Sequence, residues 1–174
     1  MRRRPMSTAV AVAAIVAAGN GALAAESAGD RPHVEFLDAG KIRPPGLPFS
    51  DAVRVGDLLF LSGQIGVVPG KREVVPGGIA AEARQTMENI RTALEALGYA
   101  MDDLVKCTVM LDDMAEWGAF NEVYKTFFDA RYPARSAFGA DGLALGARVE
   151  VECIAATRDD APTAMDDAPF GAGE

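Results

Sequence analysis

Two strand-like segments near the C-terminal end carry the residues best suited to do chemistry. Arg135 opens one of them, and Glu150 and Glu152 interrupt the apolar run 149–154 of the other. Because side chains alternate along a strand, both glutamates face away from the apolar residues between them. A guanidinium can hold a planar carboxylate through two parallel hydrogen bonds, and a carboxylate can take a proton from water and return it. The residue types alone are equally compatible with a structural Arg135–Glu150 ion pair.

The sequence excludes several common catalytic centres. Its single histidine, His33, lies before the predicted folded unit and is interpreted as a solvated residue, so no nucleophilic triad can be assembled. The two cysteines, Cys107 and Cys153, form no Cys-x-x-Cys pair, which rules out the common zinc frameworks. Gly77-Gly78 precedes a predicted helix but lacks the rest of any phosphate-binding motif.

Length and charge narrow the class of protein further. The 174 residues suit one domain, and 49% hydrophobic residues are enough for an ordinary core. The formal charge of the whole chain is −8. Residues 1–24 hold three arginines and no acid, which leaves 14 of the 17 basic residues against 25 acidic ones, a charge of −11. A surface this acidic repels phosphate backbones, which argues against nucleic-acid binding.

The first 24 residues have the pattern of a Sec-type signal peptide. Arg2–Arg4 form a basic start, residues 8–18 form an uncharged apolar run, and Ala22-Leu23-Ala24 is a small-x-small cleavage pattern. The run is too short for a membrane anchor, which needs about 20 residues, and Pro5 and Met6 fit a twin-arginine signal poorly. We therefore expect a periplasmic or secreted protein with no membrane attachment after cleavage.

The rest of the chain divides into three parts. Residues 25–40 are an N-terminal lead-in with an extended piece at 32–37, residues 41–158 form the folded domain, and residues 159–174 are an acidic tail. The tail repeats Asp-Asp-Ala-Pro and is poor in aliphatic residues. We expect it to be disordered rather than to act as a docking segment.

Hydrophobic periodicity within the domain predicts the element order β-β-α-β-α-β-β. The predicted strands cover 52–55, 58–62, 104–111, 135–140 and 148–156, with a tight turn at Gly56-Asp57. An apolar stripe at helical spacing covers 79–97, and a second helix begins after Asp113 and ends before Pro133. Two helices cover one face of a single sheet, so we expect a partner subunit to cover the other.

Five sequence blocks resemble one known family, the reactive intermediate deaminases of the RidA/YjgF type. Each block alone is weakly specific, but together they are highly specific and cover nearly all of residues 47–157. In chain order the blocks are Leu47-Pro48-Phe49-Ser50-Asp51-Ala52-Val53, Phe60-Leu61-Ser62-Gly63-Gln64-Ile65, Asn121-Glu122-Val123-Tyr124, Pro133-Ala134-Arg135-Ser136 and Val149-Glu150-Val151-Glu152-Cys153-Ile154-Ala155.

The resemblance implies an α+β fold of the chorismate-mutase-like type, with a single mixed sheet and two helices on one face. It implies a homotrimer with one ligand cleft at each subunit interface. The activity implied is that of a 2-iminobutanoate/2-iminopropanoate deaminase, which hydrolyses 2-imino acids and their enamine tautomers to 2-keto acids and ammonia without a cofactor or a metal. The implied partners are a small imino or keto acid and other copies of the chain.

The family's functional residues map onto this sequence one by one. Arg135 matches the arginine that binds the substrate carboxylate, and Glu150 matches the glutamate that acts as acid and base. Ser62 and Gly63 match cleft residues at a strand end, and Asn121 matches a helix residue at the rim. If Arg135 and Glu150 line one cleft, the arginine should lower the Glu150 pKa in the free protein.

Two further positions complete the implied site. The backbone carbonyl of Ala137 matches the group that helps to hold the attacking water. Phe49 stands where many family members have tyrosine, so the apolar wall is kept and one hydroxyl is lost. We expect this difference to affect the range of substrates more than the reaction.

The two cysteines could be oxidised in an exported protein. The resemblance places the strands of Cys107 and Cys153 side by side. A disulfide also needs directly opposed Cβ atoms about 3.5–4.5 Å apart, and we favour two buried thiols as ordinary core residues.

Two other functions compete with the deaminase. One is a non-catalytic trimer that binds small carboxylates through Arg135 or acts as a holdase. The other is ribonuclease activity, sometimes attributed to the family, against which the charge of −11 and the lack of a catalytic histidine both argue. Glu150 together with Arg135 favours the enzyme, because a passive binder needs no acid/base group.

Overall fold

One mixed sheet holds the strands of the described chain. The structure is a computed structural model that describes residues 32–42, 46–129 and 131–157. The expected signal peptide and the acidic tail lie outside these residues. The strands are β1 (Val34–Leu37), β2 (Ala52–Val55), β3 (Leu58–Leu61), β4 (Gln64–Ile65), β5 (Leu104–Leu111), β6 (Ala134–Gly139) and β7 (Val149–Ala156). Their order is β1-β2-β3-β7-β5-β6, with β4 also paired to β7. Only β5 and β6 run parallel among these pairs.

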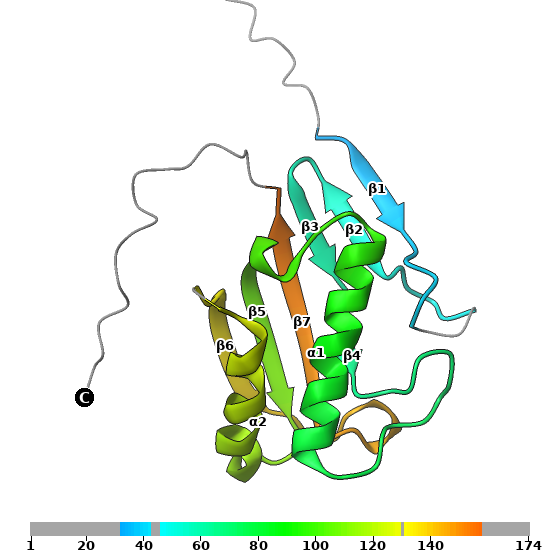
Figure 1. The fold of residues 1–174 in the computed structure, drawn as a ribbon. Coiled ribbons are helices and arrows are strands. Elements are labelled where there is room, and N and C mark those ends of the chain that lie inside the picture. The colour runs from blue at the N-terminus through cyan, green and yellow to red at the C-terminus, as the bar shows by residue number, and fades with distance from the viewer. Residues whose placement is uncertain (1–31, 43–45, 130, 158–174) are drawn as a thin grey trace, which may run out of the picture. The chain divides into compact units, whose positions relative to one another are not determined.

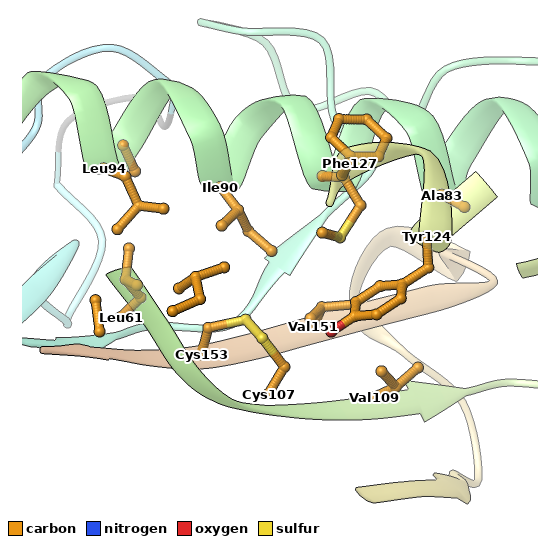
Figure 2. Packing of buried hydrophobic residues seen from close by; sticks show 14 of the residues in the cluster. Leu61, Ala83, Ile90, Leu94, Cys107, Val109, Tyr124, Phe127, Val151 and Cys153 are labelled. Carbon is orange, nitrogen blue, oxygen red and sulfur yellow. A yellow bond between two sulfur atoms is a disulfide. The ribbon is translucent and has the colours of Figure 1, made fainter. Parts of the chain in front are cut away.

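Helices α1 (Ile79–Ala96) and α2 (Trp117–Tyr124) lie on one face of this sheet (Figure 1). The middle of the apolar stripe of α1, from Ala83 to Leu94, is fully buried, and Figure 2 shows Ile90 and Leu94 pointing from the helix toward the strands that carry Cys153 and Val109. The expected α+β class, a single mixed sheet with two helices on one face, is confirmed. Among the described residues, no helix is long and apolar enough to cross a bilayer.

The second helical region is more broken than its sequence predicts. Asp113 accepts a hydrogen bond from the Ala115 amide, as a capping residue does, but the turn it opens is a short 3-10 segment, Met114–Glu116. α2 follows for eight residues, and a second 3-10 turn, Lys125–Phe127, ends the region well before Pro133. This compact region carries the aromatic residues that will contact Arg135.

The hairpin at Gly56 matches its prediction, and the sheet extends beyond it. Gly56 has φ 56°, a left-handed conformation that favours glycine, and joins β2 to β3. β1, which lies within the lead-in, pairs antiparallel with β2 and forms one end of the sheet. Phe36 of β1, Val53 of β2 and Phe60 of β3 are cross-strand neighbours on the face away from the helices, and Phe36 is 76% exposed.

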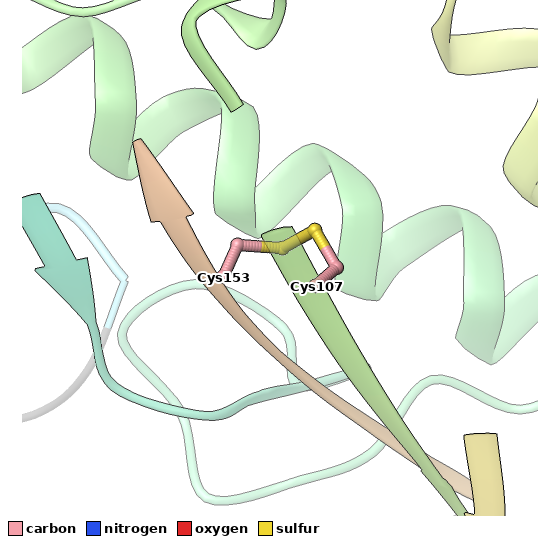
Figure 3. Close-up of a disulfide and its surroundings, with 2 residues drawn as sticks. All are labelled: Cys107 and Cys153. Atoms are coloured by element: carbon pink, nitrogen blue, oxygen red, sulfur yellow. A yellow bond between two sulfur atoms is a disulfide. The ribbon is translucent and has the colours of Figure 1, made fainter. Parts of the chain in front are cut away.

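Cys107 and Cys153 form a disulfide, so the expectation of two free thiols is wrong (Figure 3). The two residues occupy directly opposite positions in the antiparallel pair of β5 and β7, with their Cα atoms 4.1 Å apart. Both side chains are buried on the helix side of the sheet. Strand periodicity predicts that each side chain is buried, but only the register of the two strands shows that they are opposed.

Candidate active site

Glu150 lies on β7 and faces away from the helices. Its neighbours Val149 and Val151 are fully buried on the helix side, and the register places Glu150 opposite Met110 of β5 and Ile65 of β4. The carboxylate is half-buried against the backbone of Gly63: a Cβ at position 63 would overlap the Glu150 Oε1 atom and lie 2.9 Å from its Cδ. Glycine is therefore required at 63 if the carboxylate is to keep this position.

Burial raises the pKa of the Glu150 carboxyl above its ordinary value, and the negative charge of Glu152 raises it further. Both causes favour the protonated form, which moves the group toward the neutral range where proton transfer in both directions is efficient. Within one subunit Arg135 does not contribute to this shift, so the lowering of the Glu150 pKa by Arg135 stays a prediction for a cleft in which the two residues meet.

A pocket of about 340 Å³ opens beside the Glu150 carboxylate. It brings together three of the predicted site residues, Phe49, Gly63 and Glu150. Ser62 lies next to Gly63, but its hydroxyl donates to the Ser50 carbonyl at 2.7 Å and so fixes the segment that carries Phe49. The remaining lining residues are mostly apolar: Ile42, Leu47, Gln64, Ile65, Val67, Lys71, Arg72, Ala144 and Leu145.

Buried polar groups on α1 hold two walls of this pocket in place. The Asn89 amide, 1% exposed, donates to the carbonyls of Ile65 and Val67, both at 3.0 Å. The Glu82 carboxylate accepts the backbone N–H of Arg148 at 2.8 Å, two residues before Glu150. The Arg148 guanidinium also contacts Glu116. The start of β7 is thus tied to α1 and to the turn before α2.

Arg135 lies on β6 in a second, separate pocket. Its guanidinium carbon is 4.6 Å from the ring centre of Tyr124 and 5.8 Å from that of Phe120, both on α2. The pocket, of about 310 Å³, is lined by Asn121, Tyr124, Lys125, Tyr132, Pro133 and Arg135. Asn121 is therefore brought to Arg135, as the sequence predicts.

Polar atoms in the Arg135 pocket are buried without hydrogen-bond partners. They are Oδ1 of Asn121 and the hydroxyl of Tyr124. Burial raises the pKa of Tyr124 to about 12, even though the nearby Arg135 charge lowers it, so the phenol stays neutral. Buried polar atoms without partners are costly, and such a cluster beside a guanidinium is suited to receive a polar anionic ligand.

Arg135 and Glu150 lie on opposite faces of the sheet, and no ion pair joins them. Arg135 is in register with Cys107, whose side chain points to the helices, whereas Glu150 is in register with Met110 on the open face. Ala137 shares the helix side with Arg135 and packs against the core. The expected single cleft is therefore divided between two places in one subunit.

The pockets also contain residues that the sequence analysis did not place in the site, among them Tyr124, Lys71 and Arg72. Tyr124 follows Asn121 by three residues in one of the family blocks, and this helical spacing was a usable signal that the two residues share one side of α2. Lys71 and Arg72 follow the Pro69-Gly70 turn, and nothing in their spacing indicates that the turn folds back to the Glu150 pocket. Among the described residues, no cluster of His, Cys, Asp and Glu side chains could hold a metal ion.

Comparisons with known proteins show the family and the fold of this chain. The family profile described as Endoribonuclease L-PSP matches residues 41–157. The 2-iminobutanoate/2-iminopropanoate deaminase of Mus musculus is 44% identical over 108 residues, which cover 62% of this chain and 80% of that protein. Among solved structures, YEO7 of yeast superposes with a TM-score of 0.69 at 36% identity, over 72% of this chain and all of the other. E. coli TdcF with bound serine gives a TM-score of 0.66 at 32% identity, over 71% and 99% of the two chains.

Proposed function

The chain belongs to the Endoribonuclease L-PSP family, which includes the RidA/YjgF reactive intermediate deaminases, and from this premise we propose that it hydrolyses 2-imino acids to 2-keto acids and ammonia. The observation that carries the proposal is the position of the Glu150 carboxylate, which lies against Gly63 at the wall of a mostly apolar pocket. Its surroundings raise the pKa of this carboxyl. A passive binding protein has no need of such a group.

The reaction needs one proton carrier and one anion site. Water adds to the C=N carbon while Glu150 takes a proton from it, and the same carboxyl returns a proton to nitrogen. Glu150 then passes the hydroxyl proton of the resulting carbinolamine to its amino nitrogen, the C–N bond breaks as the C=O bond forms, and the products are one 2-keto acid and one ammonia for each water consumed. Arg135 binds the substrate carboxylate through two parallel N–H···O bonds, which fixes the imine carbon for attack.

We propose that a complete site forms between two subunits of a homotrimer. Arg135 with Asn121 from one subunit would face Glu150 with Gly63 from the next, because one subunit holds these groups on opposite faces of its sheet. The face of the sheet away from the helices supports assembly, because it exposes apolar side chains that a neighbouring subunit would shield from water. These are Phe36, Leu58, Phe60 and Phe138, each at least 40% exposed.

We also propose that the protein works after export, in the periplasm or outside the cell. The Cys107–Cys153 disulfide supports an oxidising compartment, and the first 24 residues have the composition of a signal peptide. The intact mass of protein recovered from the exported fraction should correspond to a chain that begins at Ala25. Soluble protein that retains Arg2–Arg4 would contradict export by cleavage.

A direct assay tests the activity. An amino-acid oxidase generates the imine from an amino acid, semicarbazide intercepts the free imine, and active protein should lower the semicarbazone signal while keto acid and ammonia still form. Glu150→Gln should abolish this effect but retain binding of a 2-keto acid. If wild-type protein binds keto acids without speeding hydrolysis, it is the carboxylate binder that the separate Arg135 pocket could also support.

A further inference from the structure

Two cations line the Glu150 pocket, and the proposed reaction does not use them. Lys71 and Arg72 follow the turn at Pro69-Gly70, and both side chains are exposed at the pocket wall. Neither side chain has an ion pair or a hydrogen bond with any described residue, and no acidic residue of the pocket other than Glu150 is available to neutralise them. They are adjacent positive charges in a protein whose net charge is −8.

The backbone holds the turn that carries these cations in a defined place. The Gly70 amide donates to the Ile42 carbonyl at 2.7 Å, and the Lys71 amide donates to the Val68 carbonyl at 3.0 Å. Val67 and Val74 form a bridge that closes the turn. Ile42 and Val67 are themselves lining residues, so the cations belong to the wall of the pocket.

The pocket that holds the two cations and Glu150 is otherwise lined mostly by apolar side chains. The pKa of Glu150 is shifted upward by burial and by Glu152, and neither Lys71 nor Arg72 contributes to the shift. Side chains such as Ile42, Phe49 and Leu145 occupy the rest of the wall. A ligand that reaches from Glu150 to the cations therefore needs an aliphatic middle and an anionic far end.

We infer that this pocket selects dicarboxylic 2-imino acids, with Lys71 and Arg72 binding the distal carboxylate. The inference rests on the proposed function and names its substrate class: imines derived from glutamate or 2-aminoadipate. The methylene groups lie on the apolar wall, the imine carbon lies at Glu150, and Arg135 of a neighbouring subunit holds the carboxylate next to the reacting carbon. A three-carbon imine would leave most of the 340 Å³ unfilled.

Kinetics on two substrates of similar size test the inference. Glutamate-derived and leucine-derived imines are generated in place by amino-acid oxidases, and the assembled protein is compared with the double variant Lys71→Gln/Arg72→Gln. The variant should lose about tenfold in kcat/KM for the glutamate imine, mainly through KM, and stay within twofold for the leucine imine. Because the cations are exposed, the wild-type preference should also weaken as salt is added. Arg84→Gln, which removes an exposed charge from α1, is the control and should leave kcat/KM for both imines unchanged.

Binding of stable product analogues separates failure of the inference from failure of the proposed function. Calorimetry should show that 2-oxoglutarate binds the wild type more tightly than 4-methyl-2-oxopentanoate does, and that the double variant loses this preference. Hydrolysis of both imines with a ratio that the variant does not change would overturn the inference and leave the function standing. Absence of hydrolysis would overturn the function, and the 2-oxoglutarate preference would then decide whether the cations select ligands. If neither keto acid binds, both proposals are wrong.

Discussion

The Glu150 and Arg135 pockets hold their charged groups in different ways. Glu150 is enclosed by backbone: Gly63 lies against its carboxylate, and hydrogen bonds from α1 fix the surrounding strands. Arg135 rests on the rings of Tyr124 and Phe120, beside polar atoms that have no partner. The first region is therefore complete as a proton carrier, whereas the second is incomplete until an anion arrives. This division suits a reaction in which a carboxylate must be bound before water is activated.

The largest effect is expected from mixing subunits. Arg135→Ala and Glu150→Gln should each be inactive alone, but random co-assembly should restore about one quarter of the wild-type sites if each site takes Arg135 from one subunit and Glu150 from its neighbour. The measurement is imine hydrolysis after the two variants are unfolded and refolded together. If the mixed protein stays inactive, each site takes Arg135 and Glu150 from the same subunit, and the proposed division of the site between subunits is wrong.

Next in size is the effect of Gly63→Ala. The added methyl must move the Glu150 carboxylate, which is the flexible end of a side chain, so kcat should fall about 100-fold while the melting temperature hardly changes. Gly118→Ala is the matched control, since a Cβ there meets nothing within 4 Å. A Gly63→Ala protein of normal activity would show that the contact with Gly63 does not position the carboxylate.

Tyr124 offers a test of the other region. Tyr124→Leu removes the ring beneath the guanidinium and should raise KM about tenfold, because a desolvated cation–π contact is worth on the order of 1–2 kcal/mol. Tyr124→Phe keeps the ring and should recover most of the affinity. If both variants change KM equally, the buried hydroxyl rather than the ring is responsible. If only kcat changes, Tyr124 does not act through substrate binding.

The disulfide lies between the two regions and should affect neither. Cys107→Ala/Cys153→Ala should lower the free energy of unfolding by about 2–4 kcal/mol, measured by urea denaturation, with kcat/KM within twofold of wild type. Cys107 is in register with Arg135, so a large loss of substrate affinity in this variant would mean that the bond also positions β6.

The smallest effect is the response of stability to pH. The pKa of Glu150 in the folded protein is raised above its unfolded value of about 4.5, so the folded state binds more protons than the unfolded state between these two pKa values. The protein therefore loses stability as the pH rises from the unfolded pKa to the folded pKa. Glu150→Gln should therefore melt about 1–3 °C higher than wild type above the folded pKa, with a difference that shrinks toward pH 4. A variant that melts lower at neutral pH would indicate a stabilising charge partner for Glu150.

Local structure was predicted well from the sequence because local signals determine it. The predicted helix 79–97 and strand 104–111 correspond to α1 at Ile79–Ala96 and β5 at Leu104–Leu111. The family membership expected from five sequence blocks is also confirmed. Both results depend on periodicity or on spacing along one segment, and neither requires knowledge of how distant strands pair.

The errors have a common cause, which is register between strands. Alternation shows that Glu150 and Glu152 share a face of β7, but it cannot relate that face to the face of Arg135 on β6. For the same reason, the sequence does not show that Cys107 and Cys153 occupy opposite positions on neighbouring strands. Lys71 and Arg72 were missed because the fold of a turn, and not any motif, brings them to the pocket.

The contact between Gly63 and Glu150 has an evolutionary consequence. The space that a side chain at 63 would need is filled by the very oxygen proposed to carry the proton, so substitutions at these two positions cannot be independent. A lineage can acquire a side chain at 63 at low cost only after it has lost the glutamate at 150. Homologues in which both positions have changed should therefore mark branches that keep the fold and have abandoned the hydrolysis, and restoring the glutamate alone in such a protein should not restore activity.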